Sequence, residues 1–213
     1  MFRTLRVFHI NLQSDINKFM KLPQKKSMDR FMLHLKNLKY LPKDANIVLI
    51  NSRDLIYGMT AIIRDCRVSS KFIELDISVH KNNLELLLEK LTSIGKIDNA
   101  RLIVEEEIEK GQLIEDGISY FNNERFWESH ESLEGAWKQS KGSEKELIQG
   151  LILVAAALVH YQKNEDEICL SVLGRALDKL HDKSGQYCKI NVDDVKQKVI
   201  EMLDKKIIFT FMF

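Results

Sequence analysis

The placement of proline constrains the fold of this chain more than any other single feature. Both prolines, Pro23 and Pro42, lie within the first 43 residues of the 213-residue sequence. Because proline lacks a backbone N–H group and breaks helices, its absence from the remainder permits long helices there. From about Glu106 onward the strand signals stop, and helical periodicity predicts five helices: Ile108–Asn122, Arg125–Ser140, Glu144–Gln162, Glu165–Leu180 and Val192–Lys205.

The residues before this helical stretch alternate between strand-like and helix-like patterns. Short β-branched or alternating runs predict strands at Thr4–Ile10, Asn46–Ile50, Lys71–Val79 and Ala100–Val104. Apolar residues at helical spacing predict helices at Met28–Leu38, Leu55–Cys66 and Leu84–Leu91. This alternation predicts an α/β sandwich, and both a ferredoxin-like split arrangement and a parallel sheet fit it.

We therefore predict an α+β chain in two parts. Residues 1–105 form the α/β sandwich, residues 106–206 form an all-helical bundle, and residues 207–213 form an apolar tail. Leu151–Val159 is apolar on every side, which places its helix at the centre of the bundle, and it is too short to cross a bilayer. The tail (IIFTFMF) is expected to be covered, either as a strand against the α/β part or at a dimer contact, because an exposed apolar strand invites aggregation.

Several polar residues are expected at helix ends. Ser143 and Glu146 have the spacing of a capping box, in which hydroxyl and carboxylate satisfy the first backbone amides. Asn164 and Asn191 are expected to be N-caps of the two following helices. Gly95 is expected to close the Leu84–Leu91 helix in a left-handed conformation.

Charge and cysteine content narrow the function classes. Lys plus Arg number 32 and Asp plus Glu 31, and the net charge of +1 gives no protein-wide field for nucleic acid or a membrane. Residues 1–43 are basic and residues 105–134 acidic; we interpret these segments as solvated faces, with a nucleic-acid arm at the amino end as the alternative. Phosphate-loop and nucleophile-elbow motifs are absent. Three widely spaced cysteines and no signal peptide predict a cytoplasmic protein.

One helix carries an unusual polar face. Trp127, His130, Glu134 and Trp137 are spaced by three, four and three residues, so they share one side of the helix, with Glu131 on the adjoining side. On the next helix, Gln149 and His160 share a face at similar spacing and meet the first set if the two helices are antiparallel neighbours. The remaining four histidines, His9, His34, His80 and His181, are expected at surface or edge positions.

These two helices also carry a resemblance. Phe121-Asn122, Phe126-Trp127-Glu128, His130-Glu131, Leu133-Glu134 and Trp137, followed by Gln149-Gly150-Leu151-Ile152, Ala155-Ala156-Ala157-Leu158 and His160, resemble the signature of the domain of unknown function 309 family. The resemblance covers about Ile114–Leu180. It implies a small all-helical domain of a soluble prokaryotic, archaeal or plastid type, and no established activity.

Three interpretations of the polar face stay open. In the first, the face binds a peptide, a nucleotide or a second copy of the chain without catalysis, as a binding or scaffolding module. In the second, His130, Glu134 and His160, with Glu131 or Gln149, hold zinc, iron or manganese for a hydrolase-like reaction, and Trp127 and Trp137 shape the pocket. In the third, Glu134 accepts a hydrogen bond from His130 or an indole in a buried structural network. The site residues predicted under all three are Trp127, His130, Glu131, Glu134, Trp137, Gln149 and His160.

Overall fold

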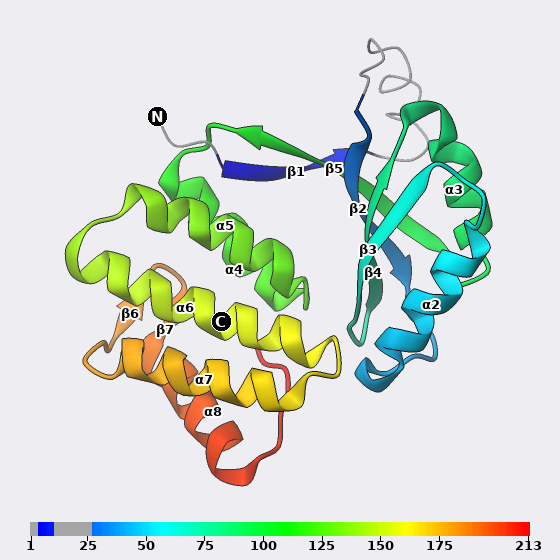
Figure 1. The fold of residues 1–213 in the computed structure, drawn as a ribbon. Coiled ribbons are helices and arrows are strands. Elements are labelled where there is room, and N and C mark those ends of the chain that lie inside the picture. Colours follow the sequence, from blue (N-terminus) through cyan, green and yellow to red (C-terminus); the bar gives the residue numbers. More distant parts are fainter. Residues whose placement is uncertain (1–3, 11–26) are drawn as a thin grey trace. The chain divides into compact units, whose positions relative to one another are not determined.

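The computed structural model describes residues 4–10 and 27–213, and it divides the chain into two compact units (Figure 1). The sheet unit spans Val7–Val104, and the helical unit combines Met1–Arg6 with Glu105–Phe213. The first contains a β-sheet with helices and the second is dominated by helices. The predicted fold class is confirmed.

The sheet is antiparallel wherever its pairing is described. Its strands are β1 (Thr4–Ile10), β2 (Asp29–Lys36), β3 (Ala61–Val68), β4 (Phe72–Val79) and β5 (Ile97–Glu106). Helix α2 (Ala45–Leu55) connects β2 to β3 and helix α3 (Leu84–Leu91) connects β4 to β5, with 3₁₀ turns at Pro42–Asp44 and Lys81–Asn83. The strand order is β1-β5-β2-β4-β3, and β2 pairs antiparallel with both β4 and β5. From β2 to β5 the elements follow the βαββαβ order of the ferredoxin-like fold, so that arrangement is present and the parallel alternative is wrong.

One face of the sheet and the inner faces of its two helices form an apolar core. Alternate residues of β4 are buried there, in antiparallel register with alternate residues of β2: Ile73, Leu75 and Ile77 with Leu35, Leu33 and Phe31 respectively. Helix α3 buries Leu84, Leu87, Leu88 and Leu91, the i, i+3, i+4, i+7 pattern that the sequence shows. The alternation in β4 therefore predicts the strand and its apolar core face correctly, whereas the expectation that only one face is buried is wrong, because Glu74, Asp76 and Ser78 are buried too.

Three predicted elements of this unit are wrong because short apolar runs fit both periodicities. Asn46–Ile50 lies inside helix α2, which buries Ala45, Val48 and Ser52 rather than alternate residues. Met28–Leu38 contains strand β2, and its buried core residues alternate. The stripe Leu55–Cys66 is broken by a turn containing Gly58, whose φ is +80°, and the chain then enters β3.

Gly95 serves close packing rather than helix termination. It is absent from the glycines with positive φ, so the predicted left-handed cap is wrong. A Cβ atom at this position would lie 2.9 Å from the carbonyl oxygen of Lys36. Glycine therefore allows the chain before β5 to approach the end of β2.

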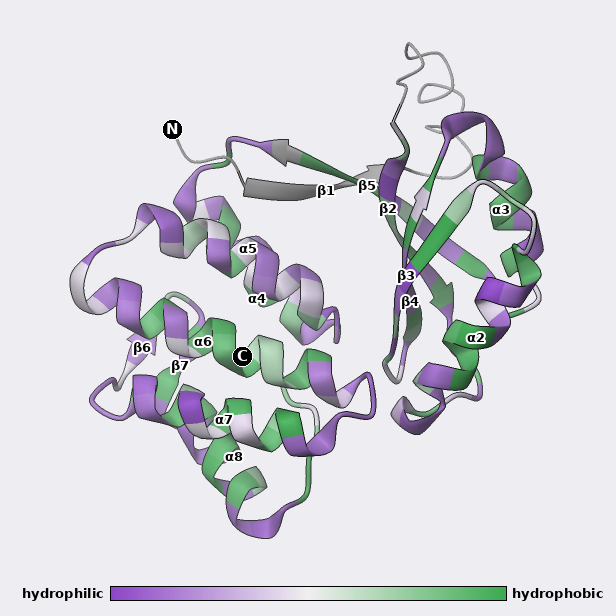
Figure 2. Cartoon of the chain, viewed as in Figure 1, coloured by the Kyte–Doolittle hydropathy of each residue, from purple (hydrophilic) through white to green (hydrophobic). Residues whose placement is uncertain are grey.

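The helical unit contains five helices among the residues that the structure describes. They are α4 (Lys110–Asn122), α5 (Phe126–Gln139), α6 (Gly142–Tyr161), α7 (Asp166–Leu180) and α8 (Val192–Lys205), with a short hairpin of β6 (Gln186–Tyr187) and β7 (Ile190–Asn191) before α8. Helix α6 contacts both α5 and α7 and is apolar along much of its length (Figure 2). Leu151, Val154, Ala155 and Leu158 are fully buried, which confirms its predicted central place.

Helices α4–α5 and α6–α7 form two hairpins with the same turn. Glu124 in the first turn and Asn164 in the second are left-handed, with φ of 58° and 63°. The backbone N–H groups of both residues donate to the carbonyls three residues earlier, over 2.9 Å in each turn. Each backbone hydrogen bond of the first turn has a counterpart forty residues later, including Ser129 N to Arg125 O and Cys169 N to Glu165 O. The bundle thus repeats one helix–turn–helix unit.

The predicted helix caps have different outcomes. Asn191 is the N-cap of α8, and its Oδ1 accepts hydrogen bonds from the backbone of Asp193 and Asp194 at 3.1 and 3.2 Å. Asn164 is not an N-cap, because it occupies the left-handed position of its turn. The capping box is also wrong: Ser143 and Glu146 accept hydrogen bonds from the buried Lys183 ammonium, over 3.1 and 2.9 Å.

The apolar tail packs on the helical unit itself. Residues 207–213 form neither helix nor strand, so the predicted strand against the α/β part is wrong. Instead Ile208, Phe209, Phe211 and Phe213 pack against the core of the bundle.

Candidate functional site

Helix α5 presents two different faces. Phe126, Ser129, Leu133 and Ala136 are buried, at the spacing of one helical stripe. Trp127, His130, Glu131 and Glu134 are half-buried and lie on another side of the helix; we call these four residues the α5 face. The sequence pattern thus correctly separates the polar side of this helix from its apolar side.

Close packing against α4 fixes the direction in which the α5 face points. Gly117 of α4 has no side chain, and a Cβ there would lie 2.8 Å from Cγ of Leu133. The hydroxyl of Ser129 donates a 2.8 Å hydrogen bond to the carbonyl oxygen of Gly117. Because these contacts hold the opposite stripe of α5 against α4, the helix cannot rotate without breaking them.

Three of the predicted residues come together on the α5 face. His130, Glu131 and Glu134 each offer one ligand atom, and these atoms all lie within 4.8 Å of one another. Nδ1 of His130 is 3.7 Å from Oε1 of Glu131, and the His130 side chain is 30% exposed. One imidazole nitrogen and two carboxylate groups therefore meet at a surface that solvent reaches.

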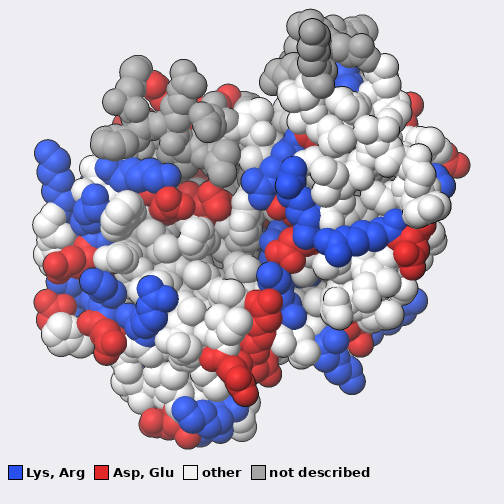
Figure 3. Space-filling model, in the orientation of Figure 1, with Lys and Arg blue, Asp and Glu red and all other residues white. Residues whose placement is uncertain are grey.

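Glu134 is paired with a cation rather than buried in a network. Its Oε1 lies 2.9 Å from Nζ of Lys138, one helical turn along α5, and both side chains are 35% exposed. The interpretation of Glu134 as part of a buried structural network is therefore wrong. Both basic and acidic side chains are visible on each unit (Figure 3).

Trp137 lies where α5 meets the start of α6. The Lys145 ammonium of α6 sits 4.0 Å from the centroid of its ring, at cation–π distance. Its indole Nε1 is buried and has no hydrogen-bond acceptor among the residues that the structure describes. Trp137 also packs against the core, so it supports the helix pair.

Gln149 and His160 lie on α6, and Gln149 is half-buried. The Nδ1 atom of His160 lies 2.5 Å from Oε2 of Glu165, in the turn between α6 and α7. The sequence predicts that His130 and Glu134 meet His160. In the structure His130 and Glu134 lie beside Glu131, and His160 contacts Glu165 in its own turn.

Sequence reasoning missed a buried ion pair at the start of α5. Arg125 and Glu128 are both buried, and their side chains form a two-bond ion pair one helical turn apart. The guanidinium also lies 4.8 Å from the centroid of the Tyr120 ring. A spacing of three residues along a helix indicates that the two side chains can form an ion pair. Because both groups are buried, removing one partner would leave an uncompensated charge, which is costly.

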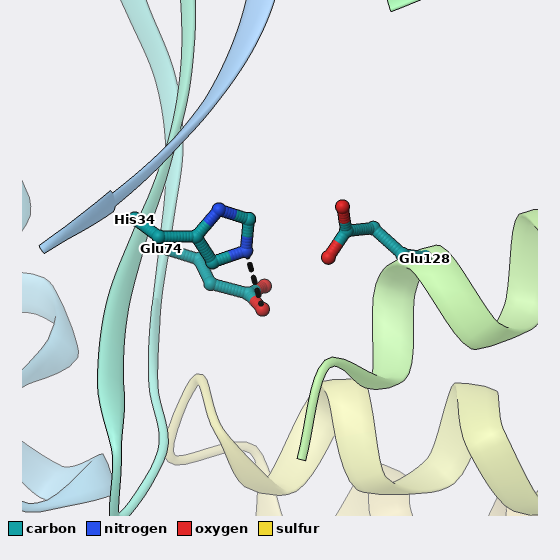
Figure 4. A group of neighbouring side chains, drawn as sticks. All are labelled: His34, Glu74 and Glu128. Atoms are coloured by element: carbon teal, nitrogen blue, oxygen red, sulfur yellow. Dashed lines mark ion pairs between the residues drawn. The ribbon is translucent and has the colours of Figure 1, made fainter. Parts of the chain in front are cut away.

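A second missed network lies on the polar face of the sheet. His34 of β2 is 1% exposed, so its predicted surface position is wrong, and its Nε2 lies 3.3 Å from Oε1 of Glu74 on β4 (Figure 4). Arg67 of β3 donates to Glu74 and to Asp65, each over 3.1 Å. Cross-strand register brings these groups together, and a pattern within one strand does not reveal that register.

The segment that carries the α5 face and its supports matches a known family. Residues 114–172 match the family model for the Domain of unknown function (DUF309). This match confirms the resemblance seen in the sequence and ends at 172 rather than near 180. The DUF309 segment includes most of α4, all of α5 and α6, and the first part of α7. The family description assigns no activity.

Two further results concern relatives and membrane-spanning helices. A search of curated proteins finds no match. Within residues 4–10 and 27–213, no helix is both long enough and apolar enough to cross a membrane.

Proposed function

We propose that the DUF309 segment is a non-catalytic binding module whose binding surface is the α5 face. Its ligand is a segment of a partner protein that carries an arginine or lysine side chain. The observation that carries this proposal is the gathering of one imidazole and two carboxylates within 4.8 Å on a half-exposed surface held by a tightly packed helix.

The contact between Glu134 and Lys138 supports a cationic ligand. The 2.9 Å pair is half-exposed, and ion pairs that solvent reaches contribute little stability, so an incoming cation can replace Lys138 at small cost. Arginine suits this surface best, because its planar guanidinium binds a carboxylate with two hydrogen bonds and stacks on aromatic rings such as Trp127. Binding needs only groups that the face already presents.

A calorimetric titration tests this function. The probe is an eight-residue Arg-Gly repeat peptide, titrated into the full chain at low ionic strength. We expect measurable binding that is lost in the double variant Glu131→Gln/Glu134→Gln and retained in Glu167→Gln, which removes an exposed carboxylate on α7. Equal binding by all three proteins, or none by the wild type, contradicts the proposal.

The divalent metal site is the second candidate, supported by the same three side chains. Imidazole nitrogen and carboxylate oxygen suit zinc, iron or manganese, and a bound metal would activate water for a hydrolase-like reaction. His160 would have to leave Glu165 to join the ligand set. Titration with Zn²⁺ of protein purified without a tag, followed by a chelator, tests it; a melting temperature unchanged by both contradicts it.

A second copy of the chain is the alternative partner for this surface. Sedimentation velocity of the protein without peptide, at concentrations from about 1 to 200 µM, tests for self-association. This range is on the order of the dissociation constant of a weak dimer. A mass that rises with concentration in the wild type and not in Glu131→Gln/Glu134→Gln supports a homodimer through the α5 face. A constant monomer mass contradicts it.

A further inference from the structure

The apolar tail, Ile207–Phe213, is held on α4 by stacked aromatic rings. The Phe213 ring lies parallel to the Phe121 ring, with 3.6 Å between centroids and 7° between planes. Two further rings meet the Phe121 ring edge-on: Phe211 of the tail, with 5.3 Å between centroids, and Phe126 of α5, with 5.0 Å between centroids. Phe121 is fully buried with these rings around it.

A hydrogen bond between the tail backbone and α4 orients the tail in this apolar contact. The backbone N–H of Phe213 donates to the side-chain Oδ1 of Asn122 over 2.8 Å. Asn122 is the last residue of α4 and follows Phe121, so one aromatic ring and one amide oxygen face the same segment. A backbone group held by a side chain fixes the register of an extended segment without depending on its sequence.

From Phe209 to Phe213 the tail alternates between half-buried and exposed side chains, whereas the adjacent Ile208 and Phe209 both pack on the core. Phe211 and Phe213 are half-buried against the core, whereas Met212 between them is 68% exposed. Alternation with period two is how an extended peptide presents its specificity-determining side chains to a surface. The tail begins after Lys206, which is left-handed with φ of 54°, so the chain turns sharply away from α8.

We infer that the surface formed by Phe121, Asn122 and Phe126, here called the Phe121 site, is a peptide-recognition site. Its ligand is an extended apolar segment with two phenylalanines separated by one residue, and the protein's own tail occupies the site in cis. This surface differs from the α5 face, so the inference stands apart from the function proposed above. Because a tethered segment acts at an effective concentration in the millimolar range, a peptide in trans competes poorly until the tail is weakened.

The test uses the full chain with a weakened tail. The probe is a fluorescein-labelled peptide of residues 203–213, whose lysines keep it soluble, and binding is followed by fluorescence anisotropy. We expect the Phe211→Ala/Phe213→Ala variant to bind the peptide at least about tenfold more tightly than the wild type. The matched control, Met212→Ala, changes an exposed tail residue and is expected to behave as the wild type does.

Site variants show where the peptide binds. Asn122→Ala and Phe121→Leu, each placed in the Phe211→Ala/Phe213→Ala background, are expected to lose most of the gain in affinity. Phe121→Leu preserves much of the buried apolar volume, and far-ultraviolet circular dichroism confirms that each variant is folded. A peptide in which Phe211 and Phe213 are replaced by alanine, with Phe209 kept, is expected not to bind.

Two results would overturn the inference. One is a folded Phe211→Ala/Phe213→Ala variant that binds the peptide no better than the wild type. The other is equal binding of a scrambled peptide of the same composition, since the surface would then select apolar chains in general rather than the spacing of Phe211 and Phe213.

Discussion

Leu133 of α5 occupies the space that a side chain at Gly117 of α4 would need. An added Cβ would lie 2.8 Å from Leu133 Cγ, closer than carbon atoms pack in proteins. This contact sets the rotation of α5 and thereby presents Trp127, His130, Glu131 and Glu134 on its half-exposed side. The position of the α5 face is therefore a consequence of packing in the bundle core.

Substitution of Gly117 by alanine should destabilise the helical unit. The clash with Leu133 is an overpacking defect, which costs about 1–3 kcal/mol. Urea denaturation followed by circular dichroism measures the change. Gly111→Ala is the matched control, because nothing lies within 4 Å of a Cβ at that helical position. Equal effects of the two substitutions would show that Leu133 does not press on α4.

The left-handed residue after α8 predicts a stabilising substitution. Lys206 has φ of 54°, which strains any residue with a Cβ, so Lys206→Gly should raise the free energy of unfolding by about 1 kcal/mol. Gln197→Gly, in the interior of the same helix, should lower it by a similar amount. The opposite signs are read from the same denaturation curves, and a loss of stability in both variants speaks against the left-handed assignment.

Thiol reactivity should distinguish the three cysteines. Burial raises the pKa of Cys66 and of Cys169 to about 12, whereas Cys188 is exposed. Since only a thiolate reacts, Ellman's reagent should label one thiol in native protein at pH 8 and three after denaturation. Cys188→Ser should remove the native signal. Rapid reaction of two or three native thiols contradicts the burial of Cys66 and Cys169.

Glu144 should link stability of the bundle to pH. The Lys110 ammonium lies 2.8 Å from its carboxylate and lowers its pKa below the ordinary value of 4.5, with help from the Tyr187 hydroxyl. A lowered pKa in the folded state stabilises the protein above the ordinary pKa, and this contribution is lost as pH falls through the folded value. Glu144→Gln should therefore reduce the melting temperature at pH 7, and this difference from the wild type should shrink as pH falls below 4.5.

The sequence predicts the helices of the bundle better than the strands of the sheet. Five helical segments appear near their predicted positions because each buries one long apolar stripe. In the sheet unit, Phe31, Leu35 and Leu38 fit a helix as well as Phe31, Leu33 and Leu35 fit a strand, and only pairing with β4 decides between them. The ferredoxin-like strand order follows from such pairings, which local periodicity does not encode.

The candidate site was predicted in part for a related reason. Spacing along α5 is local, so His130, Glu131 and Glu134 could be placed together from the sequence. His160 depends on the turn between α6 and α7, where the left-handed Asn164 brings Glu165 beside it. The repeat of the two hairpins was not visible, because Glu124 and Asn164 share a conformation without sharing a residue type.

Lys138 offers an internal check on the proposed ligand. Its Nζ lies 2.9 Å from Oε1 of Glu134, so the Lys138 ammonium competes with any incoming cation for this carboxylate. Lys138→Ala should therefore strengthen binding of the Arg-Gly peptide severalfold, while Lys179→Ala, near the end of α7, should leave it unchanged. Weaker binding after loss of Lys138 would show that the peptide does not approach Glu134.

The most direct test of the central claim follows the imidazole resonances of His130 by nuclear magnetic resonance while the Arg-Gly peptide is added to the full chain. The account predicts that the His130 and Trp127 side-chain signals shift together and saturate, whereas the His181 ring, on the exposed end of α7, does not move. If the His130 signals stay fixed at saturating peptide, or if every histidine shifts equally, the α5 face is not the binding surface.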